Sequence, residues 1–171
     1  MGSLVGWTYC PRCRAGLTRE DAKRVECRGC GFVAYGNSEP TACALCVDDD
    51  GRVLLARRAA DVFQGYWDLP GGFLEEGEHP LDAMRRELRE ETGLEIEPTD
   101  FVGIWMDRYG DADDAPATLN LYWAARVVGG EPAPADDVSE LRWFALDELP
   151  SRDELAFHIA DVLSAFRNQH P

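Results

Sequence analysis

Alternating apolar and polar positions predict a series of strands along the chain. The turn residues at 48–51 separate two apolar runs and predict a hairpin. A long polar loop at 108–116 separates the next two runs. A turn at 128–132 and an acidic loop at 134–140 precede the last predicted strand. The predicted strands are 41–47, 52–58, 101–107, 118–128 and 141–145.

Two other stretches have the spacing of amphipathic helices. Leu81, Met84 and Leu88 share one face of a helix that starts near Pro80 and ends at Gly93. Proline suits a first-turn position and glycine suits the position after a helix. A second helix is predicted at the C-terminal end, where a capping-box pattern, Ser151 with Glu154, precedes the apolar positions Leu155, Ile159, Val162, Leu163 and Phe166.

The bulk composition restricts the class of protein. A chain of 171 residues suits one medium domain, or one domain with a small module. The linker at 36–40 predicts a boundary between 1–36 and 37–171. The net charge of −15 disfavours nucleic-acid backbones and anionic membranes as partners. No apolar run approaches about 20 residues, and the start has no signal-peptide pattern. We therefore expect a cytoplasmic protein without a membrane span.

All six cysteines fall in Cys-x-x-Cys pairs, and the first two pairs lie in turn-rich surroundings. Two such knuckles offer four thiolates, the ligand set of a closed structural zinc site. About 35 residues bury too little surface to fold alone, so the metal would supply stability. Two disulfides or free thiols are the alternative, and they are less typical of a cytosolic protein. The predicted zinc ligands are Cys10, Cys13, Cys27 and Cys30.

The third pair, Cys43 and Cys46, lies in an apolar run with strand character. Side chains three apart on a strand point to opposite faces, so these two thiols cannot hold one ion. We expect both to be core residues. A redox role or a second metal site is the alternative.

The predicted helix at 80–93 carries three carboxylates at positions i, i+3 and i+4. Glu87, Glu90 and Glu91 therefore share one face. Like charges at this spacing destabilise a helix unless a cation lies among them. Mg²⁺ and Mn²⁺ prefer oxygen ligands and often bridge to substrate phosphates. A solvated acidic face is the alternative interpretation.

The stretch from Gly72 to Leu94 reads GFLEEGEHPLDAMRRELREETGL and fits a motif at every fixed position. The motif is the Nudix box, G-x5-E-x7-R-E-U-x-E-E-x-G-U, in which U is aliphatic. The chain therefore resembles the Nudix hydrolase family, and the phrases WDLPGG and ELRWFALDELP are similar to common Nudix surroundings. The first 36 residues resemble the zinc ribbon of the NADH pyrophosphatase group and its smaller relatives.

This resemblance implies a fold and a reaction. The fold is an α/β/α sandwich with a mixed sheet, preceded by a small zinc-ribbon module. The reaction is the metal-dependent cleavage of a diphosphate in a nucleoside diphosphate joined to another group, and ADP-ribose or a related sugar nucleotide is the best expectation. NAD(H), diadenosine polyphosphates, or a non-catalytic binding role of the ribbon and the Nudix frame are the alternatives. Many members dimerise, so a homodimer is a further expectation.

The resemblance also assigns roles to residues. Glu87, Glu90, Glu91 and the Gly72 carbonyl would be Mg²⁺ or Mn²⁺ ligands. Glu87 or Glu90 would be the general base, and Glu140 is the candidate on a later loop, with Asp136 and Asp137 behind it. Arg86 would hold a glutamate in its ligating rotamer. Glu78 would support the loop.

Substrate contacts are less specific in the sequence. Arg57 and Arg58 end a strand before the box and suit bidentate phosphate contact, with surface solubility as the alternative. Tyr109 lies near the position of a tyrosine in diadenosine polyphosphate hydrolases. The NADH pyrophosphatase signature SQPWPFPxS is absent after the box, where the chain reads GIWMDRYGDADDAP. The candidates for stacking on a base are Phe63, Tyr66, Trp67, Phe73, Trp105 and Tyr109.

Overall fold

The computed structural model describes residues 4, 6–21, 23–110 and 115–170. The described residues form two compact units, one from the ranges 1–39 and 108–118 and one from the ranges 40–107 and 119–171. Residues 111–114 of the predicted polar loop lie outside the described part. None of the helices in the described part is long and apolar enough to cross a membrane.

The smaller unit contains a three-stranded sheet in the order β1-β2-β3. The strands are β1 (Thr18–Asp21), β2 (Arg24–Glu26) and β3 (Val33–Tyr35), and both pairings are antiparallel. Its apolar core is small, with Leu4, Val25 and Ala34 buried at the centre. So small a core stabilises little, which agrees with a need for a metal or another crosslink.

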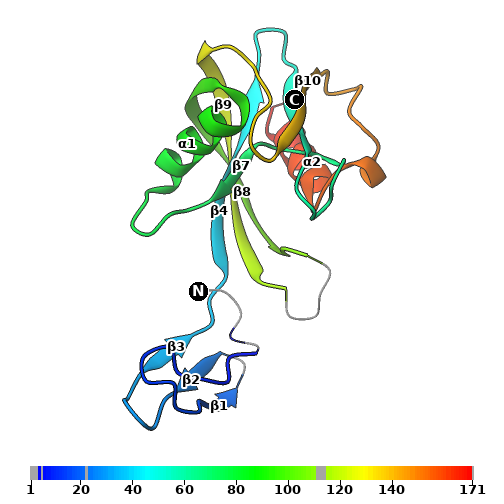
Figure 1. Ribbon diagram of the computed structural model, residues 1–171. Coiled ribbons are helices and arrows are strands. Elements are labelled where there is room, and N and C mark those ends of the chain that lie inside the picture. The colour runs from blue at the N-terminus through cyan, green and yellow to red at the C-terminus, as the bar shows by residue number, and fades with distance from the viewer. Residues whose placement is uncertain (1–3, 5, 22, 111–114, 171) are drawn as a thin grey trace. The chain divides into compact units, whose positions relative to one another are not determined.

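The larger unit is built on a seven-stranded mixed sheet with the order β10-β5-β4-β9-β8 (Figure 1). Two short strands extend it, because β6 pairs with β5 and β7 pairs with β4. The strands are β4 (Glu39–Val47), β5 (Val53–Arg58), β6 (Trp67–Asp68), β7 (Gly71–Phe73), β8 (Leu94–Arg108), β9 (Ala117–Gly130) and β10 (Val138–Phe144).

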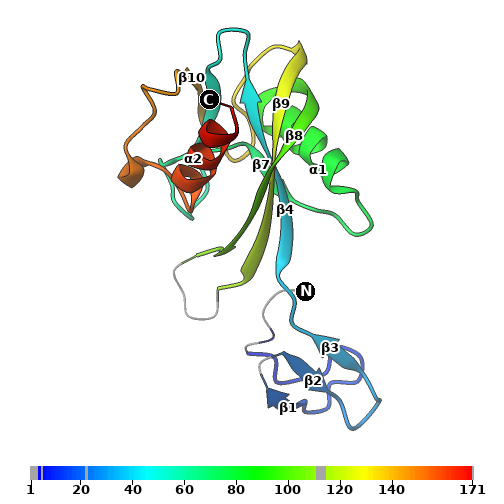
Figure 2. The ribbon, with the colours of Figure 1, turned by 180° about the vertical axis from the view of Figure 1, so that it is seen from behind.

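Two helices cover opposite faces of this sheet, α1 (Pro80–Thr92) and α2 (Ile159–Gln169) (Figures 1 and 2). The alternation along β4 explains the two layers. Ala44 and Cys46 join the core under α1, whereas Cys43 and Leu45 join the core under α2. The predicted sandwich is therefore confirmed, as is the placement of both cysteines in the core.

Several element boundaries differ from the sequence prediction. β8 begins at Leu94 instead of residue 101, and β9 continues to Gly130, into the predicted turn. The capping box of Ser151 and Glu154 is present, but it caps a separate short 3-10 turn, η1 (Arg152–Glu154). The chain then turns at Phe157, whose φ of 46° is left-handed, so the last helix cannot run on from Ser151 and begins at Ile159.

Candidate active site at the start and end of α1

The boundaries of α1 follow from the residues that flank it. Pro80 occupies the first turn, and the His79 ring accepts a hydrogen bond from the Leu81 backbone N–H at 3.3 Å. Gly93 ends the helix in the left-handed conformation with φ of 71°. Ala83, Met84 and Leu88 are buried against the sheet. Glu87 and Glu91 border this buried face on the side of β7, where they lie close to Gly72 and Gly71, whereas Glu90 is exposed. The three carboxylates have the spacing that the sequence predicts.

Arg86 links the helix to the preceding loop through several hydrogen bonds. Its Nε and Nη2 donate to the two carboxylate oxygens of Glu78 at 2.9 and 2.8 Å. Its Nη1 donates to Glu87 at 2.7 Å and to Glu90 at 3.3 Å, and Nη2 also donates to the Phe73 carbonyl at 3.1 Å. One guanidinium thus holds the loop and two of the three carboxylates, which fits the predicted positioning role.

The Glu87 carboxylate lies directly against the backbone of Gly72. A Cβ atom placed on Gly72 would stand 2.6 Å from the Glu87 carboxylate, closer than any real Cβ contact. β7 pairs with β4, opposite Ala42, and this pairing fixes Gly72 at that position. Gly72 is therefore required because any side chain there would clash with Glu87. The absence of a side chain lets the Gly72 backbone and the Glu87 carboxylate lie close together.

Glu91 is the most buried of the three glutamates. Its Oε2 accepts a hydrogen bond from the Gly71 backbone N–H at 2.9 Å. Burial raises the pKa of Glu91 to about 8, and the charges of Glu87 and Asp68 act in the same direction. Burial also raises the pKa of Glu87, against the effect of Arg86. Concentrated, partly buried negative charge of this kind suits a divalent cation with oxygen ligands.

The three carboxylates do not converge on one point. Glu87 and Glu90 face Arg86, and Glu91 faces Gly71. In the part of the chain that the structure describes, only the four cysteines bring three or more ligand atoms within 4.8 Å of one another. The metal-ligand roles of Gly72, Glu87, Glu90 and Glu91 therefore stay predictions.

Glu140 lies in strand β10 and not on a loop, which corrects the sequence prediction. The register of β10 and β5 places it opposite Arg57, and its carboxylate pairs with Arg57 at 3.4 Å and with Arg142. The strand begins at Val138, three residues earlier than predicted. Asp136 and Asp137 do lie just before the strand, and the Asp137 carbonyl accepts the Ala59 N–H at 2.7 Å.

The two candidate phosphate-binding arginines differ in their surroundings. Arg58 is mostly buried, donates to Asp68 at 2.8 Å and lies over the Phe157 ring. Burial raises the pKa of Asp68, and Arg58 opposes that shift. Arg57 is more exposed, and its Nε donates to the Gly65 carbonyl at 2.9 Å. Arg57 is thus the more accessible of the two for a phosphate.

The aromatic candidates also separate by burial. Trp67 is buried between Arg57 and Arg142, so it is a core residue. Phe73 and Tyr66 are each 38% exposed and offer ring surface to a ligand. Tyr109 groups with the smaller unit, and its backbone N–H donates to the Pro116 carbonyl at 3.0 Å. Phe63 packs edge-on against Phe157.

The structure adds a polar network that the sequence did not reveal. Nδ1 of His158 lies 2.9 Å from Asp107 Oδ2, and its Nε2 lies 3.1 Å from the Tyr122 hydroxyl. Trp105 stacks on the imidazole with an angle of 6° between the ring planes. Burial raises the pKa of Tyr122. The only local signals were polar groups at inward positions of two strands, separated from His158 by 51 and 36 residues.

The four cysteines of the smaller unit form a compact cluster. Their sulfur atoms lie within 4.8 Å of one another, with Cys10 3.6 Å from Cys30 and Cys13 3.4 Å from Cys27. Each pair combines one cysteine from each knuckle, and all four thiols are free. Burial acts to raise the pKa of Cys10, but backbone N–H groups of the knuckle outweigh it and lower that pKa to about 6. This donor set fits a tetrahedral zinc ion.

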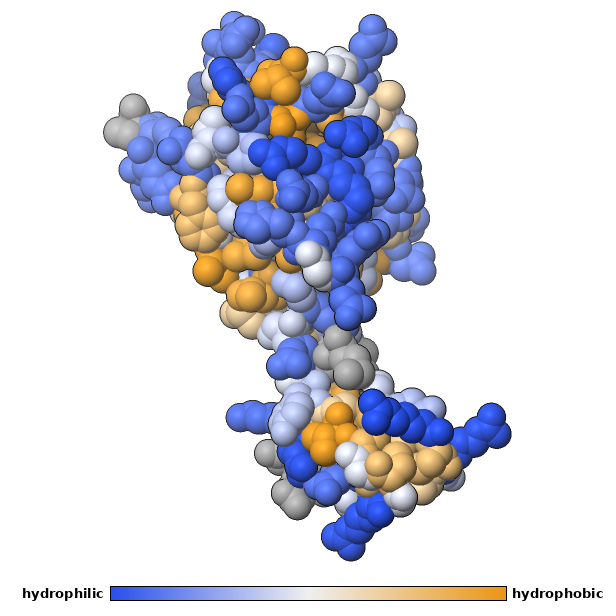
Figure 3. Space-filling model, turned by 90° about the vertical axis from the view of Figure 1, so that its left-hand side faces the viewer, coloured by the Kyte–Doolittle hydropathy of each residue, from blue (hydrophilic) through white to orange (hydrophobic). Residues whose placement is uncertain are grey.

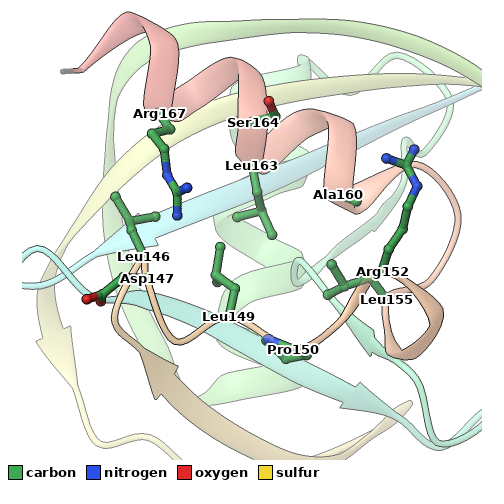
Figure 4. A pocket seen from close by; sticks show the side chains of 10 residues that line it. All are labelled: Leu146, Asp147, Leu149, Pro150, Arg152, Leu155, Ala160, Leu163, Ser164 and Arg167. Carbon is green, nitrogen blue, oxygen red and sulfur yellow. The ribbon is translucent and has the colours of Figure 1, made fainter.

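A cleft of about 470 Å³ lies elsewhere in the larger unit, between residues 146–155 and α2 (Figure 4). Leu149 and Leu163 contribute apolar lining, and Arg167 points into it from α2. None of the predicted site residues lines this cleft.

Comparison with known proteins places these features in one family. The family described as the NUDIX domain matches residues 37–166. The NAD-capped RNA hydrolase NudC of Pseudomonas aeruginosa is 32% identical over 165 residues, which cover 94% of this chain and 56% of NudC. This chain thus spans little more than half of that relative. The ADP-ribose pyrophosphatase of Methanocaldococcus jannaschii is 35% identical over 120 residues, covering 70% of this chain and 68% of that protein.

Solved structures show the same fold. A NUDIX hydrolase from Nitrosomonas europaea has a TM-score of 0.79 at 22% identity, covering 95% of this chain and 92% of its own. A MutT NUDIX hydrolase from Burkholderia pseudomallei has a TM-score of 0.67 at 29% identity, covering 75% of this chain and 98% of its own.

Proposed function

The chain belongs to the Nudix hydrolase family, and we propose that it hydrolyses the diphosphate of a nucleoside diphosphate joined to another group. ADP-ribose or a related sugar nucleotide is the proposed substrate. The observation that carries the proposal is the arrangement around Arg86, which fixes Glu87 against Gly72 and holds Glu78 in the loop. The relative named ADP-ribose pyrophosphatase supports the choice of substrate.

The residues of α1 have separate roles in this proposal. Glu87, Glu90, Glu91 and the Gly72 carbonyl would hold Mg²⁺ or Mn²⁺. A bound divalent cation neutralises diphosphate oxygens and lowers the pKa of water. Glu90 is about half exposed and, among the described residues, its carboxylate contacts only Arg86, at 3.3 Å, so it is the carboxylate best able to accept a proton from water. Arg86 positions Glu87 and does not contact substrate.

A second candidate substrate is the NAD type. The NudC of Pseudomonas aeruginosa matches over 94% of this chain, which is too much to leave out residues 1–36, whereas the ADP-ribose pyrophosphatase matches over 70%. Both substrates contain the same diphosphate flanked by adenosine, so one set of carboxylates serves either. The difference lies in the group on the far side of the diphosphate.

A substrate panel tests both. ADP-ribose, NADH, NAD-capped RNA, diadenosine polyphosphates and sugar nucleotides are incubated with Mg²⁺ or Mn²⁺, and products are separated by chromatography. Glu90→Gln is expected to lower kcat by at least 100-fold on the best substrate. Glu97→Gln is the matched control, because Glu97 is exposed on β8 and paired with Arg126. Equal activity of Glu90→Gln and Glu97→Gln would contradict the assignment of Glu90 to the active site.

A further inference from the structure

The charge of the chain is divided unevenly along its length. Six of the 17 Lys and Arg residues but only three of the 32 Asp and Glu residues fall within residues 1–36. This segment therefore carries a formal charge of +3, and residues 37–171 carry −18. Four thiolates with one Zn²⁺ would add −2 and leave the segment at +1. The net charge of the chain is thus strongly negative although residues 1–36 carry a net positive charge.

Three of the basic side chains lie on the cysteine knuckles. Arg12 and Arg14 belong to the first knuckle and Arg28 to the second, and all three are exposed. The sulfur cluster brings both knuckles together. Arg12 lies over the Phe32 ring at 5.2 Å from its centroid. Among the described residues, Arg14 and Arg28 have no ion-pair partner, so their charge faces solvent.

Exposed aromatic rings accompany these arginines. Tyr9 directly precedes the first knuckle and is 71% exposed, the highest value among the large hydrophobic side chains. Tyr35 is 56% exposed, with the Arg24 guanidinium 6.0 Å from its ring centroid. Figure 3 shows blue, hydrophilic side chains standing around an orange and tan surface on the smaller unit. The small core accounts for the partly buried rings of Trp7 and Phe32 but not for the exposure of Tyr9.

We propose that this knuckle surface, made of Tyr9, Arg12, Arg14 and Arg28, binds single-stranded nucleic acid. Arginines contact the phosphates, and Tyr9 stacks on a base. Basic side chains interleaved with exposed aromatic rings are the combination that such partners require. The acidic remainder of the chain repels a phosphate backbone, so binding is confined to this surface. The proposal concerns binding alone and does not depend on which substrate is hydrolysed.

The chemistry favours nucleic acid over an acidic protein. Carboxylate-rich peptides would use the arginines but offer nothing flat to the Tyr9 ring. Unpaired bases use both, because each base has a face that stacks. Duplexes hide these faces and offer only phosphates, so single strands are preferred.

The number of arginines determines the expected affinity for a single strand and its dependence on salt. Neutralising about three phosphates of a single strand gives a slope of about −2 in log K against log salt. The dissociation constant is expected at about 10–100 μM in 50 mM salt. Removing the Tyr9 ring, and with it the stacking on one base, is expected to weaken binding by about tenfold.

The test uses the full zinc-containing chain and a fluorescein-labelled oligouridylate of 12 nucleotides. Anisotropy is measured from 50 to 300 mM KCl without added divalent ions, so that hydrolysis does not interfere. Oligothymidylate of the same length shows whether the 2′-hydroxyl matters. Binding of either strand with a slope near −2 supports the proposal. No binding at 1 mM protein overturns it.

Matched variants locate the surface. Arg14→Glu with Arg28→Glu leaves the contact of Arg12 with Phe32 in place and is expected to weaken binding at least tenfold. Arg126→Glu with Arg167→Glu makes the same change in net charge on the larger unit and is expected to change binding less than twofold. Zinc content and circular dichroism verify that each variant is folded. Equal weakening by both pairs assigns the effect to total charge and contradicts the proposal.

Tyr9→Ala and two competitors test the stacking. Tyr9→Ala is expected to weaken binding about tenfold. Poly-glutamate and a 12-base-pair duplex are expected to compete poorly with the labelled strand. If either competes as well as unlabelled oligouridylate, the surface is a general anion site, and the assignment to single-stranded nucleic acid is wrong.

Discussion

Arg86 and Glu78 are joined by two parallel hydrogen bonds, 2.9 Å from Nε to Oε1 and 2.8 Å from Nη2 to Oε2. They connect the middle of α1 to the loop that follows β7. The hydrogen bonds from Arg86 and from the Glu75 backbone N–H lower the pKa of Glu78 to about 2. The geometry of the loop and the charge of Glu78 are therefore linked.

The first prediction concerns acid stability. Glu78 has a folded-state pKa near 2, below its ordinary value of 4.5, so the ionised form stabilises the fold. That contribution is complete above about pH 4.5 and is lost as the pH falls towards 2. Glu78→Gln is therefore expected to lower the urea concentration at the unfolding midpoint at pH 6. Between pH 5 and 2.5 this midpoint should fall less steeply in the variant than in the wild type. Identical pH profiles of variant and wild type would contradict this.

The second prediction concerns Gly72. Gly72→Ala places a Cβ atom 2.6 Å from the Glu87 carboxylate, and the flexible end of Glu87 moves aside. We expect a melting temperature close to that of the wild type but a fall in kcat of about 100-fold, the effect of displacing a catalytic group by about 1 Å. Gly16→Ala is the control, since nothing lies within 4 Å of its added Cβ. Full activity of Gly72→Ala would show that the position of Glu87 does not matter for the reaction and would contradict its assigned role.

The elements predicted best from sequence are those with local signals. Pro80 and Gly93 mark both ends of α1, and the alternation of Cys43 and Cys46 places them in opposite layers. The knuckles were also recognisable, because both cysteines of each pair lie within one turn. In each case the information lies within a few residues, where backbone preference and side-chain periodicity decide the structure.

The features that were missed depend on distant partners. The capping box at Ser151 is real, yet the packing of Phe157 against Phe63 and Arg58 accompanies a left-handed φ that ends the turn. Arg58 reaches Asp68 through the pairing of β5 with β6. Glu140 is drawn into a strand by its register opposite Arg57. Such pairings are set by the tertiary fold and leave no periodic trace in sequence.

The third prediction concerns zinc. Cys10→Ser removes one of four clustered ligands, and the smaller unit has too small a core to stay folded without the metal. The variant is expected to lose bound zinc, measured by atomic absorption, and to become sensitive to protease within residues 1–36. Cys46→Ala is the control: it alters the core under α1 and should retain a full zinc content. A metal-free wild type that resists protease would contradict the zinc assignment.

The last prediction concerns the network of His158. A carboxylate accepts hydrogen bonds, so Nδ1 of His158 donates to Asp107 and Nε2 accepts from the Tyr122 hydroxyl. Tyr122→Phe removes one hydrogen bond and is expected to cost about 1 kcal/mol. His158→Ala costs more, about 2–4 kcal/mol, because it removes one hydrogen-bond partner of the buried Tyr122 hydroxyl and opens a cavity beside Trp105.

Urea unfolding at pH 7.5 measures both changes, and Glu148→Ala, at an exposed position in the larger unit, is the control, with a change below about 0.5 kcal/mol. Nitrogen chemical shifts of the imidazole report the tautomer independently. A proton on Nε2 and none on Nδ1 would reverse the direction of both hydrogen bonds and would overturn the network as described.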